Sequence, residues 1–144
     1  MKSLNIKIAF VFIWLGFIGA ISFMEAWLKF QAPGATLEIC LSIGDLVFSA
    51  LNKVELVCAT VVIFFSIDKF KTKNISINFI IVLLILLVQT FLISPKLSER
   101  VALIVNHQPV EDSYLHLYFV VSELTKTIFL LIYGFKLLKN KNSV

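Results

Sequence analysis

Charged residues are scarce in this chain. Asp, Glu, Lys and Arg make up 15% of its 144 residues, whereas soluble domains carry about 25%. Hydrophobic residues make up 59%, and the mean hydropathy is +0.95. These values exclude a water-soluble globular fold and predict an integral membrane protein. A chain of this length is expected to form a single membrane domain, residues 1–144.

Cysteine is almost absent as well, which removes disulfide cross-linking as a source of stability. The two cysteines, Cys40 and Cys58, would lie about 27 Å apart on one continuous helix. A disulfide needs Cα atoms within about 7 Å of each other. Both cysteines are therefore expected to be small, buried, apolar residues.

Motifs for cofactors and nucleotides are also missing. The sequence has no glycine-rich phosphate loop, no nucleophile elbow and no Cys-x-x-Cys pair. Its two histidines, His107 and His116, are not placed to hold a haem between helices. With Glu111 and Asp112 they would allow a surface zinc site, although the spacing is unspecific. We expect no cofactor, no metal and no catalytic residue that the sequence identifies.

Four apolar stretches are long enough to cross a membrane, which takes about 20 helical residues. Pro33 and Gly34 end the helix between the first two stretches. The second stretch would be about 48 Å long, so either it tilts or protrudes, or residues 36–48 form a separate re-entrant or interfacial helix. A short helix, Leu97–Asn106, is expected in the loop before the last stretch. The prediction is an all-α bundle of four transmembrane helices, with approximate spans 8–24 extending to 30, 36–67, 75–94 and 113–138.

The placement of lysines orients these spans. The positive-inside rule puts both termini in the cytoplasm, and the preference for lysine over arginine favours a bacterial inner membrane for this multi-pass chain. The sequence pI is about 9.1, but the lysines are spread over three ends without interleaved aromatic residues. The lipid bilayer is therefore an expected partner, and nucleic acid is not. The cytoplasmic set is Lys2, Lys7, Lys69, Lys71, Lys73, Lys136, Lys139 and Lys141, and the outer set is Lys29, Lys96 and Arg100.

Ionisable residues inside the predicted spans are the most informative feature of the sequence. Lys53, Glu55, Glu123 and Lys126 fall within apolar stretches, where a charge is costly and marks a candidate functional site. Glu55, Gln89 and Glu123 each lie 13 residues from a predicted cytoplasmic edge, at a depth of about 20 Å. Three helices therefore bring a polar residue to one level, in the outer half of the bilayer.

We interpret the polar residues at this depth as the lining of a shared polar crevice that opens outward. Ser22 lies close to the same depth. His116 and Glu123 are seven residues apart, so they line one helix face, and Lys126 projects about 60° away. The crevice would bind an ion or a small molecule. Its candidate ligand-binding residues are Asn52, Glu55, Gln89, His116, Glu123 and Lys126, and the candidate residues at its mouth are Glu25, Lys29 and Arg100.

Purely structural pairing is the alternative for the same charges. Glu55 with Lys126, and Glu123 with Lys53, would neutralise one another. Polar side chains commonly hold membrane helices together through hydrogen bonds of about 0.6–2 kcal/mol. The sequence leaves both interpretations open.

Three stretches of the first 55 residues carry a resemblance to known small membrane proteins: Trp14-Leu-Gly16, Phe30-Gln-Ala32-Pro33 and Gly44-Asp-Leu-Val-Phe48-Ser-Ala-Leu51-Asn52-Lys-Val-Glu55. Together with the helix count, they are similar to the transmembrane protein 205-like group, four-helix membrane proteins whose domain has no known function. Lys29-Phe30 followed by Glu55 also resembles DoxX-like four-helix proteins, which implies a link to redox or quinone-linked membrane complexes. Neither resemblance supplies catalytic residues.

Three functions fit these observations. The first is binding or transport of an ion or small molecule through the outward-facing crevice. The second is a non-catalytic accessory or structural subunit, in a homo-oligomer or a larger membrane complex, with Trp14, Gly16 and Gly19 furnishing an exposed docking face. The third is a membrane-embedded enzyme that acts on a lipid-like substrate at Glu55 or Glu123.

Overall fold

The computed structural model describes residues 2–67 and 76–142, with side chains as far as Lys141. Within these ranges the chain forms helices, turns and loops and no strand. Several charged residues used to orient the spans, and the predicted start of the third span at residue 75, lie outside the described residues. The charged residues concerned are Lys69, Lys71 and Lys73.

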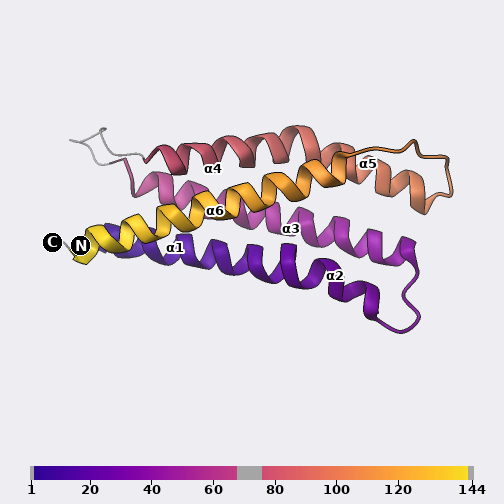
Figure 1. Cartoon of the computed structure of the whole chain (residues 1–144), viewed down its shortest axis with the longest axis horizontal. Helices are drawn as coiled ribbons and strands as arrows, with labels where there is room; N and C mark the ends of the chain where they lie inside the picture. The colour runs from indigo at the N-terminus through magenta and orange to yellow at the C-terminus, as the bar shows by residue number, and fades with distance from the viewer. Residues whose placement is uncertain (1, 68–75, 143–144) are drawn as a thin grey trace.

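Four long helices build the described chain, and each is long and apolar enough to cross a membrane. The first runs over Lys2–Gln31 and the third over Ile77–Val105. The second is α3, Leu37–Phe64, and the fourth is α6, Leu115–Asn142. Successive long helices run in opposite directions, so that the first begins and α6 ends at the same end of the bundle (Figure 1). The predicted all-α, four-helix fold is confirmed.

The first and third long helices change their hydrogen-bond pattern part-way along their length. Each contains a π-helical segment, a wider turn that is frequently found at functional sites. The elements of the first helix are α1 (Lys2–Ile18), π-helix η1 (Gly19–Glu25), α2 (Ala26–Leu28) and 3-10 helix η2 (Lys29–Gln31), and those of the third are α4 (Ile77–Val88), π-helix η3 (Gln89–Ile93) and α5 (Ser94–Val105).

Pro95 does not end the third helix, although the sequence predicts a span boundary there. It lies in the first turn of α5. Its missing N–H removes one bond to the preceding turn, and the π-helical segment η3 immediately before it accommodates this change without a break. The short helix expected at Leu97–Asn106 is therefore the C-terminal part of the third long helix.

Thr36 fixes the beginning of α3. Its side chain accepts a hydrogen bond from the backbone N–H of Ile39 at 3.4 Å. The preceding turn contains Gly34, whose φ of 80° is easily adopted only without a Cβ. From Leu37 the helix continues for 28 residues to Phe64. Residues 36–48 therefore form no separate re-entrant helix, and the alternative of one long helix is the correct one.

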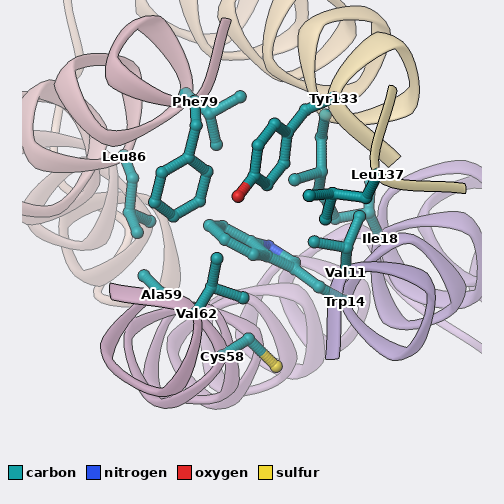
Figure 2. Close-up of a cluster of buried hydrophobic side chains, with 12 residues drawn as sticks. Val11, Trp14, Ile18, Cys58, Ala59, Val62, Phe79, Leu86, Tyr133 and Leu137 are labelled. Carbon is teal, nitrogen blue, oxygen red and sulfur yellow. The ribbon is translucent and has the colours of Figure 1, made fainter. Parts of the chain in front are cut away.

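The apolar core occupies the half of the bundle nearer to the two chain ends, and all four long helices contribute to it. Figure 2 shows Trp14 in the middle of this core, with Val62 on one side and Phe79 and Tyr133 on the other. The rings of Phe79 and Tyr133 stack with centroids 4.8 Å apart. Both cysteines are buried and free, as expected. The core consists of Val11, Trp14, Ile18, Cys58, Ala59, Val62, Phe79, Val82, Leu86, Leu130, Tyr133 and Leu137.

Candidate functional site

A polar cluster covers the apolar core on the side away from the chain ends. Ser22 from η1, Glu55 from α3, Gln89 from η3, and Glu123 and Lys126 from α6 together form this buried cluster. Each of the four long helices thus contributes at least one residue. The prediction that these side chains lie at one level is confirmed by their contacts.

Lys126 is the centre of the buried cluster. Its side chain is 0% exposed, and its ammonium lies 2.6 Å from Glu55 Oε1 and 2.9 Å from Glu123 Oε2. It also donates a hydrogen bond to Gln89 Oε1 at 2.6 Å. A lysine ammonium has three N–H groups, so these three acceptors use all of them. The predicted pairing of Glu55 with Lys126 is confirmed.

Glu123 is held at both of its carboxylate oxygens. Oε1 accepts a hydrogen bond from Ser22 Oγ at 3.1 Å, and Oε2 accepts one from Gln89 Nε2 at 2.8 Å in addition to its contact with Lys126. Gln89 Nε2 also donates to Ser122 Oγ at 2.9 Å. The amide of Gln89 thus accepts from the ammonium and donates to the carboxylate, which fixes its orientation.

Glu55 is held at one carboxylate oxygen only. Oε1 accepts a hydrogen bond from Trp14 Nε1 at 2.8 Å and also contacts Lys126. Within the described part of the chain, no hydrogen bond or ion pair ends on Oε2 of Glu55. The two carboxylates of the cluster therefore differ, because donors reach both oxygens of Glu123 but only one oxygen of Glu55.

The cluster has more negative than positive charge when both carboxyl groups are ionised. Two carboxylates and one ammonium sum to a formal charge of −1, and none of the three side chains is more than 4% exposed. An uncompensated charge inside a membrane protein is costly. A further cation, either a proton or a metal ion, would therefore be stabilised at this position.

Helix periodicity explains why these polar side chains are buried. Glu123 and Lys126 are three residues apart on α6 and so share one face. Glu55 precedes the core residue Cys58 by three positions, and Gln89 follows Leu86 by three. The helix faces that bury apolar side chains in the core continue into the cluster and bury the polar ones there.

Two of the six predicted ligand-binding residues lie outside the buried cluster. Asn52 donates a hydrogen bond to Thr90 Oγ1 at 2.8 Å, beside Gln89 but not in contact with the charges. His116 is exposed at the N-terminal end of α6. The spacing of seven residues places His116 and Glu123 on one face of α6. That face is buried at Glu123 but exposed at His116, and the spacing alone does not predict this difference.

The three residues predicted at the crevice mouth lie at the end of the bundle away from the chain termini. Lys29 pairs with Glu25 Oε2 at 3.4 Å, and the lysine side chain is 10% exposed. Its ammonium lies 5.3 Å from the ring centroid of Phe48. Arg100 is placed separately, because its Nη2 donates to the backbone oxygen of Glu111 at 2.6 Å.

Two phenylalanines pack across α3 and α6 on the side of the cluster away from the chain termini. Phe48 precedes Glu55 by two helical turns, and Phe119 precedes Glu123 by one. Their ring centroids are 5.3 Å apart in an edge-to-face arrangement. This pair lies where the predicted crevice would open.

Trp14 and Lys53 have surroundings that differ from those expected. Trp14 is 0% exposed and bonded to Glu55, so it is not part of an exposed docking face. Tryptophan in a span is usually near the membrane interface, and its position in mid-span is the signal that could have indicated a buried partner. Lys53 is exposed, and its predicted pairing with Glu123 is wrong because Glu123 pairs with Lys126 on the same helix.

Two hollows in the described surface are lined by residues outside the buried cluster. One of about 290 Å³ includes Gly16 and Ala20, and one of about 360 Å³ includes Arg100 and Glu111. Among the residues described, no group of three or more His, Cys, Asp and Glu side chains could hold a metal ion.

Comparison with known proteins gives no match. No protein-family model matches the chain, no curated protein matches it, and no solved structure matches it. What the buried cluster does must therefore follow from its own chemistry.

Proposed function

We propose that this chain is a membrane protein that binds and transports an ion or a small polar molecule, with the buried cluster as its binding centre. The observation that carries the proposal is a single ammonium, that of Lys126, shared by Glu55 and Glu123 at 2.6 and 2.9 Å. The surplus negative charge favours a cation as the ligand.

A purely structural role would need only one carboxylate. Lys126 with Glu123 alone is a neutral pair, and the hydrogen bonds from Ser22 and Gln89 already join Glu123 to two other long helices. Glu55 adds a second negative charge that this packing does not require. Ionisable residues kept inside a membrane span at an energetic cost mark binding sites and ion pathways.

Transport requires the cluster to open toward at least one side of the membrane. The π-helical segments η1 and η3 carry Ser22 and Gln89, two of the partners of Glu123. Such segments interrupt a regular helix and allow it to bend. We infer that bending at η1 and η3, together with separation of Phe48 from Phe119, opens the outward-facing crevice.

The charges at the two ends of the bundle support an orientation. We propose that both termini are cytoplasmic and that the protein resides in a bacterial inner membrane, because lysines gather at the end where the chain begins and ends. We also propose that the chain is related to transmembrane protein 205-like or DoxX-like proteins, because stretches of its first 55 residues resemble them. The described lysines at this end are Lys2, Lys7, Lys136, Lys139 and Lys141, against Lys29, Lys96 and Arg100 at the other.

Trp14 provides a test of ion binding, because its indole donates to Glu55. The only other tryptophan in the sequence, Trp27, is 55% exposed, so Trp27→Phe leaves Trp14 as the fluorescent reporter. In lipid nanodiscs, we expect its emission to change with the concentration of one cation among H⁺, Na⁺ and K⁺. The response should be lost in Glu55→Gln and retained in Glu99→Gln, which changes an exposed glutamate. No response to any of the three cations would refute ion binding.

A non-catalytic subunit of a membrane complex is the second candidate function. The hollow of about 290 Å³ is lined by Ile13, Gly16, Phe17 and Ala20. A Cβ at Gly16 or Gly19 would meet nothing within 4 Å, so this face leaves room for a helix of a second copy or of another protein. Ala20→Cys in an otherwise cysteine-free chain should then form disulfide-linked dimers in native membranes if the protein is a homo-oligomer through this face. A chain that stays monomeric under oxidation would exclude that arrangement.

A further inference from the structure

We propose that the bound ion is a proton and that Glu55 carries it while Glu123 stays ionised, an inference that rests on the proposed ion-binding function. A proton from a hydronium ion forms an O–H bond at Glu55 Oε2, and the hydronium ion becomes water. The formal charge summed over Glu55, Glu123 and Lys126 then changes from −1 to 0. The cluster is neutral when one of its two carboxyl groups is protonated.

The hydrogen bonds of the two carboxyl groups assign the proton to Glu55. Donors from Ser22, Gln89 and Lys126 reach both oxygens of Glu123, and hydrogen bonds donated to a carboxylate favour its ionised form. Oε2 of Glu55 accepts no bond from any described residue, so it can hold a hydrogen without displacing a donor.

The groups that face Glu55 come from three other segments and from its own helix. From α6 it faces the cation Lys126 and the second carboxylate, Glu123. From α1 it faces the neutral donor Trp14. The neutral amide of Gln89, on η3, does not bond to Glu55 directly but accepts a hydrogen bond from Lys126, which does contact Glu55. The thiol of Cys58, one turn along α3, lies within electrostatic reach of Glu55. Lys126 balances only one of the two carboxylates, which leaves the second to a proton.

A proton fits this position better than a metal ion does. The ammonium of Lys126 already occupies the position between the two carboxylates, at 2.6 and 2.9 Å. A metal ion would need several oxygen ligands around an open position, and the described residues provide no such group of acidic, His or Cys side chains. A proton needs no cavity, and its release from Glu55 leaves the contact between Lys126 and Glu123 intact.

Infrared spectroscopy of the full chain in lipid nanodiscs tests the proton count. At neutral pH exposed carboxyl groups are ionised, so we expect the carbonyl band of one protonated carboxylic acid. The band should disappear in Glu55→Gln and also in Glu123→Gln, because each variant leaves one carboxylate for Lys126. It should remain in Glu99→Gln. Absence of the band from the wild-type chain at neutral pH would overturn the proposal.

The position of the band identifies the carboxyl group that carries the proton. Trp14 donates to Glu55 and Ser22 donates to Glu123, so Trp14→Phe should shift the band and Ser22→Ala should leave it in place. A shift in Ser22→Ala would put the proton on Glu123 and overturn the assignment. If Trp14→Phe does not fold because Trp14 is central to the core, Ser22→Ala decides the question alone.

This result is independent of transport. If the band is present but the chain shows no cation response and no proton flux, Glu55 still carries a proton and the proposed function is refuted. If the chain responds to Na⁺ or K⁺ but shows no band, ion binding is supported and the proposal that the bound ion is a proton is refuted.

Discussion

Replacing Lys126 by methionine should destabilise the bundle severely. Its ammonium makes ion pairs of 2.6 and 2.9 Å with two carboxylates and a hydrogen bond of 2.6 Å to Gln89, all from a side chain that is 0% exposed. Removing one partner of a buried ion pair costs about 3–5 kcal/mol, because the other charge stays buried without compensation. Lys126→Met strands Glu55 and Glu123 beside each other, so we expect a loss of about 3–5 kcal/mol in the free energy of unfolding.

Unfolding by sodium dodecyl sulfate in mixed micelles, followed by circular dichroism, measures this loss. Lys53→Met is the matched control, since it makes the same substitution at an exposed lysine and should not lower the free energy of unfolding, because a charge facing lipid is itself costly. Glu55→Gln should leave stability unchanged or raised, because Lys126 and Glu123 remain a neutral pair and the new amide oxygen still accepts from Trp14. Equal effects of Lys126→Met and Lys53→Met would refute the reasoning. A loss in Glu55→Gln as large as in Lys126→Met would show that the second carboxylate is structural.

Two further predictions concern the outer end of the bundle. Gly44→Ala would put a Cβ 2.5 Å from Lys29 Nζ. Because that atom ends a flexible side chain, Lys29 should move outward at little cost in stability and react faster with a water-soluble acylating reagent; an unchanged rate would contradict this. Phe119→Ala removes a ring whose centroid is 5.3 Å from that of Phe48, and it should speed labelling of Cys58 by a water-soluble thiol reagent when the other cysteine is serine. If labelling is no faster than in the parent chain, the two rings are not the outer barrier.

The fold could be predicted from the sequence to the extent that apolar stretches determine it. Each of the four predicted spans lies within a long helix of the structure or overlaps most of one. The third helix continues past the predicted end of its span at residue 94, because a proline marks a helix end only when no wider turn compensates for its missing N–H. Here the π-helical segment η3 precedes Pro95 and the helix reaches Val105. Such a segment depends on packing between helices, which a single sequence does not describe.

The level of the candidate site and the pairing of Glu55 with Lys126 were predictable, but the partner of Glu123 was not. A constant rise of 1.5 Å per residue is enough to bring Glu55 and Glu123 to one depth. Which charges meet depends also on the rotation of each helix and on the helices that cover it. Lys53 is two residues from Glu55, so it projects to nearly the opposite side of α3, and there it is exposed. The bond from Trp14 to Glu55 was missed because an indole N–H does not change the apolar pattern of the first span.

Proton uptake by reconstituted vesicles tests most directly the claim that the buried cluster binds and transports a proton. Vesicles with a pH-sensitive dye inside would be given a membrane potential that is negative inside. The account predicts faster acidification for the wild-type chain and for Glu99→Gln than for vesicles without protein, and a rate for Glu55→Gln equal to that of the empty vesicles. Wild-type uptake no faster than that of empty vesicles, or undiminished uptake by Glu55→Gln, would contradict it.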